Sequence, residues 1–320
     1  MSEFELIQRY FTQRQSPPSY VTLGIGDDCA LMAPSAGMQL AISSDMLVAG
    51  RHFFPDADAR MLGHKALAVN LSDLAAMGAT PRAFTLALAL PQVDESWLRE
   101  FSQGLFALAD RHHCHLIGGD TTKGPLNICI TVLGDVPPHQ ALRRDSAKVG
   151  DDIWVSGTLG DARLALASYL RQQTISDEAH RQSAARLHQP IPRIELGLAL
   201  RGIAHAGIDI SDGLIGDLGH ILQRSAVGAT LDCDALPFGS ILAQQAIQTR
   251  YEYALAGGDD YELCFTAAPS DHAAVLAAAQ RAQTPVTCIG KIEAQSGLRL
   301  VDKNKQALHL SLNSFDHFSS

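Results

Sequence analysis

The segment from Pro55 to Pro81 constrains the fold more strongly than any other stretch, because its pattern predicts one long helix that is buried on most sides. Between Ala66 and Met77 only three residues are polar: Asn70, Ser72 and Asp73. A helix on the surface of a protein normally has one apolar stripe and an opposite polar face. A helix that is apolar almost all round must instead pack against neighbours on most of its surface.

Both ends of this helix are marked by residues that favour helix boundaries. Asp56 follows Pro55 and is expected to be the N-cap, while Asp58 favours the positive end of the helix dipole. Gly78, followed by Pro81, predicts the C-terminal stop.

Asp73 is out of place on such a helix, because an unpaired buried carboxylate is costly. Asn70 lies three residues earlier on the same face, so the two polar side chains can reach one site. An ion pair with an arginine, or exposure at a domain edge, would explain the acid without a function. The alternative, which we favour, is a metal or functional site.

Length and charge narrow the class of protein. A chain of 320 residues can bury a full core and is expected to form two domains of roughly 150 residues each. The stretch from Val136 to Asp152 contains Pro, Gly and paired Arg residues and marks the expected junction, which divides the chain into domains 1–140 and 141–320. A formal charge of −9 argues against a general nucleic-acid or anionic-membrane surface.

Cysteine usage and hydropathy predict a cytoplasmic protein. The six cysteines form no C-x-x-C pair and lie mostly in apolar runs, so they are expected to be reduced core thiols. No run approaches the ~20 apolar residues needed to span a membrane. Glu3 and Glu5 interrupt the apolar stretch that a signal peptide would need, and a short amphipathic helix is expected there instead.

Oxygen side chains gather on or just after expected strands. In the strand expected at 39–48, Ser43 and Asp45 share a face, whereas Ser44 would need a bend or its backbone carbonyl to join them. Two later stretches repeat the pattern: Gly118-Gly-Asp120, and Asp209, Ser211 and Asp212, which are expected on a short strand before a helix. Further strands are expected at 83–90, 127–136, 153–155 and 286–290, and helices at about 95–111 and 162–170.

The stretch from Gly24 to Asp28 superficially suggests a dinucleotide-binding loop. Asp27 and Asp28, however, stand where that motif needs uncharged backbone amides. Two adjacent acids beside glycines suit a cation better than a bare phosphate, although a turn with solvated acids explains them equally well. No P-loop or protein-kinase loop is present.

Together the acids predict a magnesium site. Seven of them lie at strand ends or on the buried helix: Asp27, Asp28, Asp45, Asp73, Asp120, Asp209 and Asp212. Hard oxygen ligands without nitrogen or sulfur select Mg²⁺ or Ca²⁺, and a site completed by substrate phosphates is typical of Mg²⁺. The residues alone therefore predict a magnesium-dependent enzyme of phosphate compounds.

Three further features can have either a structural or a ligand-binding role. Arg143 and Arg144 can form a surface salt bridge or bind a phosphate. The glycine-rich stretch 156–161 can hold an anion at a helix N-terminus or be an ordinary tight connection. His52 is expected, from the residues alone, to be a packing or capping residue rather than a ligand.

Six motifs follow one another over nearly the whole chain: Gly24-Ile-Gly-Asp-Asp28, Ser43-Ser-Asp-Met-Leu-Val48, Asn70-Leu-Ser-Asp-Leu-Ala-Ala-Met-Gly-Ala79, Gly118-Gly-Asp-Thr-Thr122, Asp209-Ile-Ser-Asp-Gly-Leu214 and Gly257-Gly-Asp-Asp-Tyr-Glu-Leu263. In order and spacing they resemble the thiamine-monophosphate kinase family of the aminoimidazole ribonucleotide synthetase superfamily. The resemblance implies ATP-dependent phosphorylation of thiamine monophosphate to thiamine diphosphate. It also implies an α/β (α+β) fold of two domains, in which an N-terminal sheet pairs across a homodimer and a C-terminal α/β domain folds over the nucleotide.

The resemblance also assigns residues. The family's magnesium positions fall on Asp28, Ser43, Ser44, Asp45, Asp73, Asp120, Asp209 and Asp212. Its ATP contacts fall on Asp28, Ser43, Gly119, Asp120, Arg144 and Ser211, and its thiamine-phosphate contacts on His52, Asp260 and Phe315. An acceptor phosphate is already ionised near neutral pH, so direct transfer without a catalytic side chain is expected.

Three positions depart from the family pattern. Ser44 stands where the family usually has threonine, which keeps the oxygen. Asp259 replaces a glutamate and shortens a side chain in the substrate loop. Phe315 stands where tryptophan or tyrosine is common, which keeps a stacking face but loses a polar group.

Rival assignments have recognisable signatures. Selenophosphate synthetase would need a reactive cysteine before Cys29, and the related hydrogenase-maturation protein would end in cysteine, whereas this chain ends in Ser319-Ser320. Another ATP-dependent enzyme of the superfamily, or a non-catalytic nucleotide or thiamine-phosphate sensor, stays open. A sensor would not need all the metal acids, which favours the enzyme.

Overall fold

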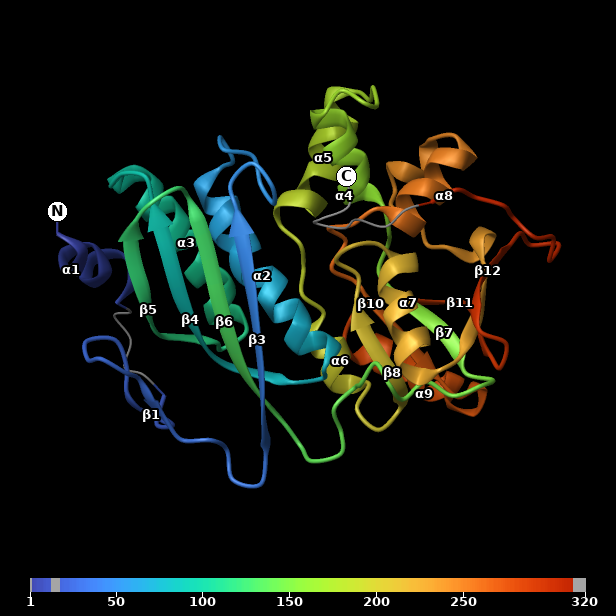
Figure 1. Cartoon of the computed structure of the whole chain (residues 1–320), viewed down its shortest axis with the longest axis horizontal. Coiled ribbons are helices and arrows are strands. Elements are labelled where there is room, and N and C mark those ends of the chain that lie inside the picture. Colours follow the sequence, from blue (N-terminus) through green and yellow to red (C-terminus); the bar gives the residue numbers. More distant parts are fainter. Residues whose placement is uncertain (1, 13–17, 313–320) are drawn as a thin grey trace. The chain divides into compact units, whose positions relative to one another are not determined.

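A computed structural model describes residues 2–12 and 18–312 of the chain. The chain divides into two units, of which the first comprises Met1–Leu74 and Ala79–His139 and the second comprises Ala75–Gly78 and Gln140–Ser320. Each unit contains a β-sheet with helices packed against it (Figure 1). The expected α/β class is therefore confirmed.

The sheet of the first unit has four strands in the order β3-β6-β4-β5. Their bounds are β3 (Gln39–Val48), β4 (Thr80–Leu90), β5 (His115–Lys123) and β6 (Asn127–Val136). β6 pairs antiparallel with β3 and β4, and β5 pairs parallel with β4, so β3 and β5 are the two edge strands. Helices α2 (Ala59–Ala76) and α3 (Glu95–Arg111) lie together on one face of this sheet (Figure 1).

The buried helix α2 has the predicted character and a different N-cap. Leu67, Leu71 and Asn70 are each at most 1% exposed, which confirms burial on most sides. The prediction that Asp56 caps the helix is wrong. Asp58 does so, because its Oδ1 accepts the N–H of Met61 at 2.9 Å while its backbone carbonyl accepts the N–H of Leu62. At the other end Gly78 has a φ of 62°, as a glycine stop requires.

Two glycines allow α2 and α3 to cross at backbone distance. A Cβ on Gly63 would lie 2.0 Å from the carbonyl oxygen of Phe101, and one on Gly104 would lie 1.9 Å from that of Arg60. Any larger residue at either position would force the helices apart. The apolar residues Leu98, Phe101 and Leu105 of α3 are buried.

The segment before the first sheet forms four short helical and strand elements within the described residues. They are α1 (Glu3–Leu6), the π-helical turn η1 (Ile7–Phe11), β1 (Val21–Leu23) and β2 (Leu31–Met32). Ser2 and Glu5 form a reciprocal capping box on α1, which accounts for the helix expected there. All six cysteines are free thiols, as predicted, but Cys29 is exposed, so the expectation that every one lies in the core is wrong.

The sheet of the second unit has six strands in the order β12-β9-β11-β7-β10-β8. Its strands are β7 (Asp152–Ser156), β8 (Ala204–Asp209), β9 (Gly228–Asp232), β10 (Leu263–Ala267), β11 (Val286–Glu293) and β12 (Gly297–Val301). Its helices are α4 (Asp161–Tyr169), α5 (Asp177–His188), α6 (Ile194–Ala199), α7 (Leu214–Ser225), α8 (Ile247–Ala256) and α9 (His272–Arg281), with short 3₁₀ turns at Cys233–Ala235, Leu242–Gln244 and Pro269–Asp271. Only β12 and β9 pair in parallel among these strands of the described chain.

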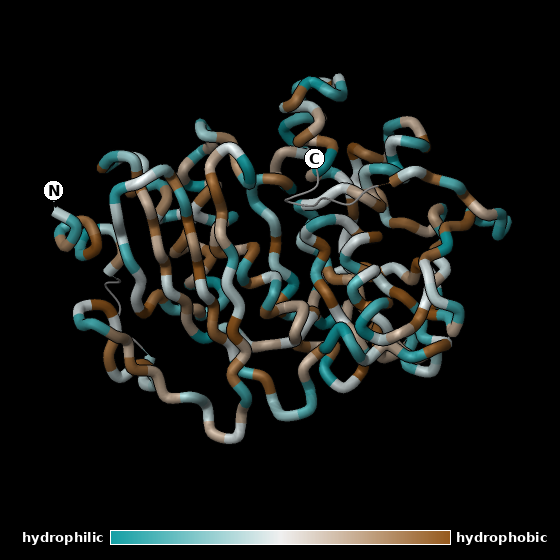
Figure 2. The backbone as a smooth tube through the Cα atoms, viewed as in Figure 1, coloured by the Kyte–Doolittle hydropathy of each residue, from teal (hydrophilic) through white to brown (hydrophobic). Residues whose placement is uncertain are grey.

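Hydropathy follows these elements. Apolar stretches run along the strands of both sheets, and the loops between them are more hydrophilic (Figure 2). In the second unit Ile153, Val155 and Ile208 of the sheet pack in one buried cluster with Leu218 and Ile221 of α7. Within the described residues, no helix is long and apolar enough to cross a membrane.

Candidate active site

The acid on the buried helix meets the edge strand of the first sheet. Ser43 donates its hydroxyl hydrogen to Oδ2 of Asp73, and the backbone N–H of Asp45 donates to Oδ1 of Asn70 at 3.1 Å. The side-chain amide of Asn70 in turn donates to the carbonyl of Ala66 at 2.9 Å, which fixes its orientation. The predicted shared face of Asn70 and Asp73, and that of Ser43 and Asp45, are both confirmed.

Ser44 lies on the opposite face of the same strand. Its hydroxyl lies 3.0 Å from that of Thr131 and donates to the carbonyl of Ile130 at 3.1 Å. The strand continues through these residues to Val48 without a register shift. Because no bend turns Ser44 towards α2, only its backbone can take part on the face of Asp73.

Asp120 lies on β5, at the other edge of this sheet. The register pairs Asp120 with Ala87, Ala87 with Cys129 and Cys129 with Met46 of β3. Three strand spacings of about 4.8 Å separate the edges, or about 14 Å in all. Asp120 is therefore not brought together with Asp73 within this unit.

Asp120 instead lines a cavity of about 710 Å³ in the first unit. Asp27, Asp28 and Gly119 also line it, and Phe4 of α1 contributes an apolar part of the lining. Further lining residues are Ile7, Phe11, Leu86, Leu116 and Ile117. The cavity thus combines carboxylates and glycine backbone with an apolar surface.

Gly119 is required by close packing next to this cavity. Its φ is 149°, and a Cβ there would lie 1.9 Å from the carbonyl oxygen of Leu86. Asp27 stabilises the neighbouring turn, because its Oδ1 accepts the N–H of Asp28 at 2.9 Å. Both acids are exposed to solvent.

His52 closes the turn after β3. Its ring Nδ1 accepts the backbone N–H of Val48 at 3.0 Å, and its backbone N–H donates to the carbonyl of Val48, also at 3.0 Å. His52 therefore has a local structural role, as expected from the residues alone, but it closes a turn after β3 and does not cap α2. A contact between His52 and a substrate stays a prediction.

In the second unit, the predicted acids lie at the end of β8 and in the turn that follows. The expected strand over 209–212 is too long, because β8 ends at Asp209 and Ser211 and Asp212 belong to the turn before α7. The reason is Asp217 in the first turns of α7. Its Oδ2 accepts the N–H groups of Ser211, Asp212 and Gly213, each at 3.1 Å, which folds the chain back before it can continue as a strand.

Burial raises the pKa of Asp217 to about 7, and the three N–H donors act in the opposite direction. The nearby carboxylate of Asp212 adds to the increase. Asp217 is 4% exposed and was not singled out in the sequence. The only signal in the sequence was an acid among the apolar residues of the first turns of α7, five residues after Asp212.

The loop from Gly257 to Glu262 lies directly beside this turn. Asp259 donates its N–H to the carbonyl of Ser211 at 2.9 Å, and Tyr261 donates its N–H to that of Ile210 at 2.8 Å. Asp259 and Tyr261 have φ values of 67° and 50°, which residues other than glycine rarely adopt. Two motifs far apart in the sequence are thus joined by backbone hydrogen bonds into one structure.

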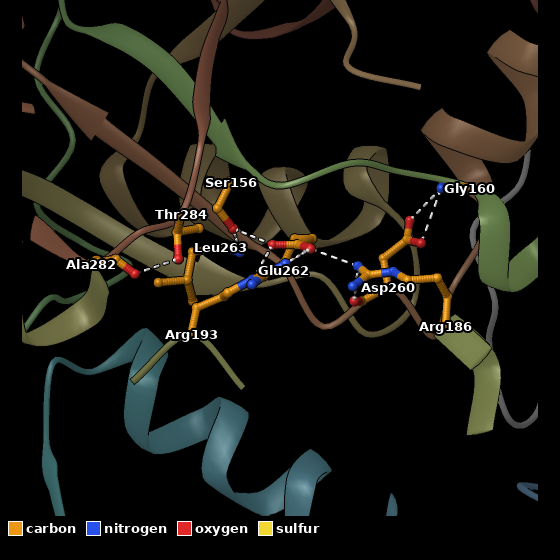
Figure 3. A network of polar contacts seen from close by, with 9 residues as sticks. All are labelled: Ser156, Gly160, Arg186, Arg193, Asp260, Glu262, Leu263, Ala282 and Thr284. Atoms are coloured by element: carbon orange, nitrogen blue, oxygen red, sulfur yellow. Dashed lines mark hydrogen bonds and ion pairs between the residues drawn. The ribbon is translucent and has the colours of Figure 1, made fainter. Parts of the chain in front are cut away.

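Glu262 anchors that loop through a buried network (Figure 3). It is fully buried, and its carboxylate accepts from Ser156 at 2.6 Å, from Arg186 at 2.6 Å and from Arg193 at 2.5 and 2.7 Å. The two arginines come from α5 and from the residue before α6, so one carboxylate ties three segments together. Sequence reasoning missed the arginines, because their 69- and 76-residue separation from Glu262 hides the contact.

Asp260 points to a different partner in the same network (Figure 3). Its two oxygens lie 3.0 and 2.9 Å from the N–H of Gly160, which precedes α4 and has a φ of 86°. The N-terminus of α4, for which an anion site was one of two explanations, therefore binds a carboxylate of the chain itself. Burial raises the pKa of Asp260 well above its ordinary value, and the charge of Arg186 opposes that increase.

The remaining assigned residues lie apart from these contacts. Arg143 forms a surface salt bridge with Asp145, which is the first of its two expected roles. Arg144 is exposed, and its backbone carbonyl accepts a hydrogen bond from the hydroxyl of Ser225. Phe315 lies outside the described residues.

The donor set fits magnesium in its chemistry. Ser43, Asp45 and Asp73 offer hard oxygen atoms, and Mg²⁺ is commonly held by one or two carboxylates together with water and substrate phosphates. Among the described residues, no three His, Cys, Asp or Glu side chains are grouped so that they could hold a metal by themselves. A phosphate-bearing substrate would therefore have to complete the coordination.

Comparison of the sequence with known proteins shows the family. Residues 26–136 match the family model "AIR synthase related protein, N-terminal domain", and residues 148–303 match "AIR synthase related protein, C-terminal domain". The thiamine-monophosphate kinase of Salmonella typhimurium is 47% identical, with 99% of this chain and 98% of that protein covered. The chain belongs to the thiamine-monophosphate kinase family.

Solved structures of the thiamine-monophosphate kinase family have the same fold. The crystal structure of the enzyme from Stenotrophomonas maltophilia K279a superposes with a TM-score of 0.84 at 47% identity, covering 91% of this chain and 93% of that one. A structure described as AaThiL complexed with AMPPCP and TMP has a TM-score of 0.76 at 28% identity and covers 88% of both chains. The family expected from the six motifs is confirmed.

Proposed function

We propose that this protein transfers the terminal phosphate of ATP to thiamine monophosphate and so forms thiamine diphosphate. The observation that carries the proposal is membership of the thiamine-monophosphate kinase family over essentially the whole chain. A related structure holds AMPPCP, an analogue of ATP, together with TMP, which supports the same pair of substrates here.

The cavity of the first unit is our candidate for the nucleotide. Its carboxylates and the Gly119 backbone suit a metal-bound triphosphate, and its apolar lining suits a base. We assign ATP contacts to six residues. Asp28, Gly119 and Asp120 line this cavity, and the other three are Ser43, Arg144 and Ser211. An arginine such as Arg144 matches the geometry of phosphate oxygens.

We assign magnesium binding to Asp28, Ser43, Ser44, Asp45, Asp73, Asp120, Asp209 and Asp212, with Ser44 contributing through its backbone carbonyl. Bound magnesium would neutralise phosphate charge and polarise the transferred group. The chain's own part is to hold its carboxylates in place, as Asp73 is held by Ser43 and as the turn at Ser211 and Asp212 is held by Asp217.

The acceptor needs no general base. The second pKa of a phosphate monoester is about 6, so its oxygen is already a nucleophile at neutral pH. Alignment and charge neutralisation are what the protein must supply. His52 and Phe315 are our candidates for direct contacts to thiamine monophosphate. Asp260, the third residue of this set, is 1% exposed and bonded to the N–H of Gly160, so we propose that it acts on the substrate through the loop that it holds.

The proposal includes a cytoplasmic homodimer that pairs through the first sheet. The face of this sheet opposite α2 carries Leu40, Ile42 and Met46, which are 41%, 62% and 54% exposed. Large exposed apolar side chains grouped on one face favour association with another protein surface.

Product analysis with a panel of acceptors tests the function. The protein is incubated with ATP and Mg²⁺ and with thiamine monophosphate, unphosphorylated thiamine, thymidine monophosphate or AMP, and ADP and thiamine diphosphate are measured by chromatography. We expect equal amounts of ADP and thiamine diphosphate with thiamine monophosphate only. A sensor would bind the ligands without releasing ADP, and preference for another acceptor would assign a different kinase.

A further inference from the structure

Asp217 is buried beneath the turn that carries Ser211 and Asp212. The backbone N–H groups of three consecutive residues, Ser211, Asp212 and Gly213, all donate to one oxygen of its carboxylate at 3.1 Å. The side chain is 4% exposed, so a ligand has almost no access to it. Whatever Asp217 does for the site, it must do through the turn above it.

The turn is also confined from its other side. The carbonyl of Ser211 accepts the N–H of Asp259 at 2.9 Å, and a Cβ on Gly258 would lie 2.4 Å from that carbonyl oxygen. Gly213 has a φ of 117°, and a Cβ there would lie 2.8 Å from the backbone of Ala256. The turn therefore sits between the Gly257–Glu262 loop and α7, and Asp217 supplies the contact from α7.

Loss of that contact would leave three converging N–H groups without their acceptor. A polar group that is buried without a partner costs free energy, so the turn would rearrange to find water or another acceptor. Because the side chains of Ser211 and Asp212 project from this backbone, any such rearrangement would redirect both of them. Small displacements of groups that bind a reacting phosphate have large effects on rate.

We propose that Asp217 is a positioning residue, which fixes the direction in which Ser211 and Asp212 present their oxygen atoms to the nucleotide and its magnesium ion. The inference rests on the proposed function, which places these two residues at the nucleotide. Its structural part, the acceptor role of Asp217 for the turn, can be measured independently of catalysis.

Hydrogen–deuterium exchange tests the structural part. In Asp217→Ala the amides of Ser211, Asp212 and Gly213 should exchange at least roughly tenfold faster than in the wild type, because they lose a buried acceptor. Asp217→Asn keeps an acceptor oxygen and should retain most of the protection. Asp151→Ala is the matched control, since Asp151 is a buried acid that accepts the N–H of Lys148 and lies outside the proposed site. Unchanged protection in Asp217→Ala would overturn the inference whether or not the protein is a kinase.

Steady-state kinetics tests the link to the nucleotide. For Asp217→Ala we expect the KM for ATP and the half-activating Mg²⁺ concentration to rise roughly tenfold or more, with a much smaller change in the KM for thiamine monophosphate. Asp217→Asn should restore both values towards the wild type.

A lower rate with unchanged ATP and Mg²⁺ dependence in Asp217→Ala would show a merely structural role and overturn the inference. Asn behaving like Ala in a folded protein would also overturn it, because acceptance of hydrogen bonds would then not be the property that matters. If the alanine variant does not fold, Asp217→Glu provides the same test, since it moves the acceptor by one methylene group. An inactive wild type would refute the proposed function instead.

Discussion

At the residue scale, the site depends on a few acids whose partners differ. Asp73 accepts a hydrogen bond from Ser43 and is half-buried, so solvent reaches part of its side chain. Glu262 is fully buried and bonded to two arginines, so it serves the structure of the loop. The two carboxylates should therefore respond differently to substitution.

Asp73→Asn should lower the rate of phosphoryl transfer by about 100-fold or more while the protein remains folded, because loss of one fixed charge or donor at such a site costs this much. The amide oxygen of Asn can still accept from Ser43. The initial rate in magnesium buffer and the unfolding midpoint measure the two effects. Asp56→Asn, an exposed acid before α2, is the control. A near wild-type rate for Asp73→Asn would remove Asp73 from the magnesium set.

Glu262→Ala should destabilise the protein by about 3–5 kcal/mol, because it leaves Arg186 and Arg193 as largely buried charges without their partner. Urea unfolding of the purified variant measures the change. Glu178→Ala removes the acid of an exposed pair with Arg181 and should cause no measurable change. Equal stability of the two variants would mean that the network does not hold the loop.

Residue contacts were predictable from the sequence where periodicity fixes them. The common face of Asn70 and Asp73 follows from helical spacing, and that of Ser43 and Asp45 from strand alternation. The capping residue was misassigned, because Asp56 and Asp58 are both good caps and only the backbone path decides between them. The roles of Asp217 and Glu262 were not predictable, because their partners come close only when the chain is folded.

At the element scale, long periodic segments were predictable and irregular ones were not. The strands at 39–48 and 127–136 and the helix at 95–111 have the predicted bounds. The strand expected over 209–212 failed, because Asp217 draws the chain into a turn after Asp209. The helix crossing at Gly63 and Gly104 was also invisible, since a glycine in a helix does not reveal which backbone approaches it.

Gly104→Ala should destabilise the protein by about 1–3 kcal/mol despite the better helix propensity of alanine, because its Cβ would overlap the carbonyl of Arg60. Gly219→Ala in α7 is the matched control, since no atom lies within 4 Å of the position of its Cβ. That variant should be as stable as the wild type or more stable by up to about 1 kcal/mol. Thermal unfolding compares them. Equal effects would show that the crossing tolerates a methyl group.

At the scale of the whole molecule, no helix of the described residues covers the face of the first sheet opposite α2, and this face carries exposed apolar side chains. Ile42→Asp should convert the proposed dimer to monomers, since a charge would replace the most exposed apolar residue of β3. Leu276→Asp changes an exposed apolar residue of α9, outside the first sheet, and should leave the dimer intact. Sedimentation velocity distinguishes the species. A wild type that sediments as a monomer, or an Ile42→Asp variant that remains dimeric, would rule out this interface.

The fate of the terminal phosphate of ATP tests the central claim most directly. The protein is incubated with terminally labelled ATP and Mg²⁺, first without and then with thiamine monophosphate, and label is measured in denatured protein, inorganic phosphate and thiamine diphosphate. We predict no label on the protein and, after addition of the acceptor, label in thiamine diphosphate in an amount equal to the ADP formed. Stoichiometric label on the protein that moves into product would contradict direct transfer, and label found only in inorganic phosphate would contradict the kinase assignment itself.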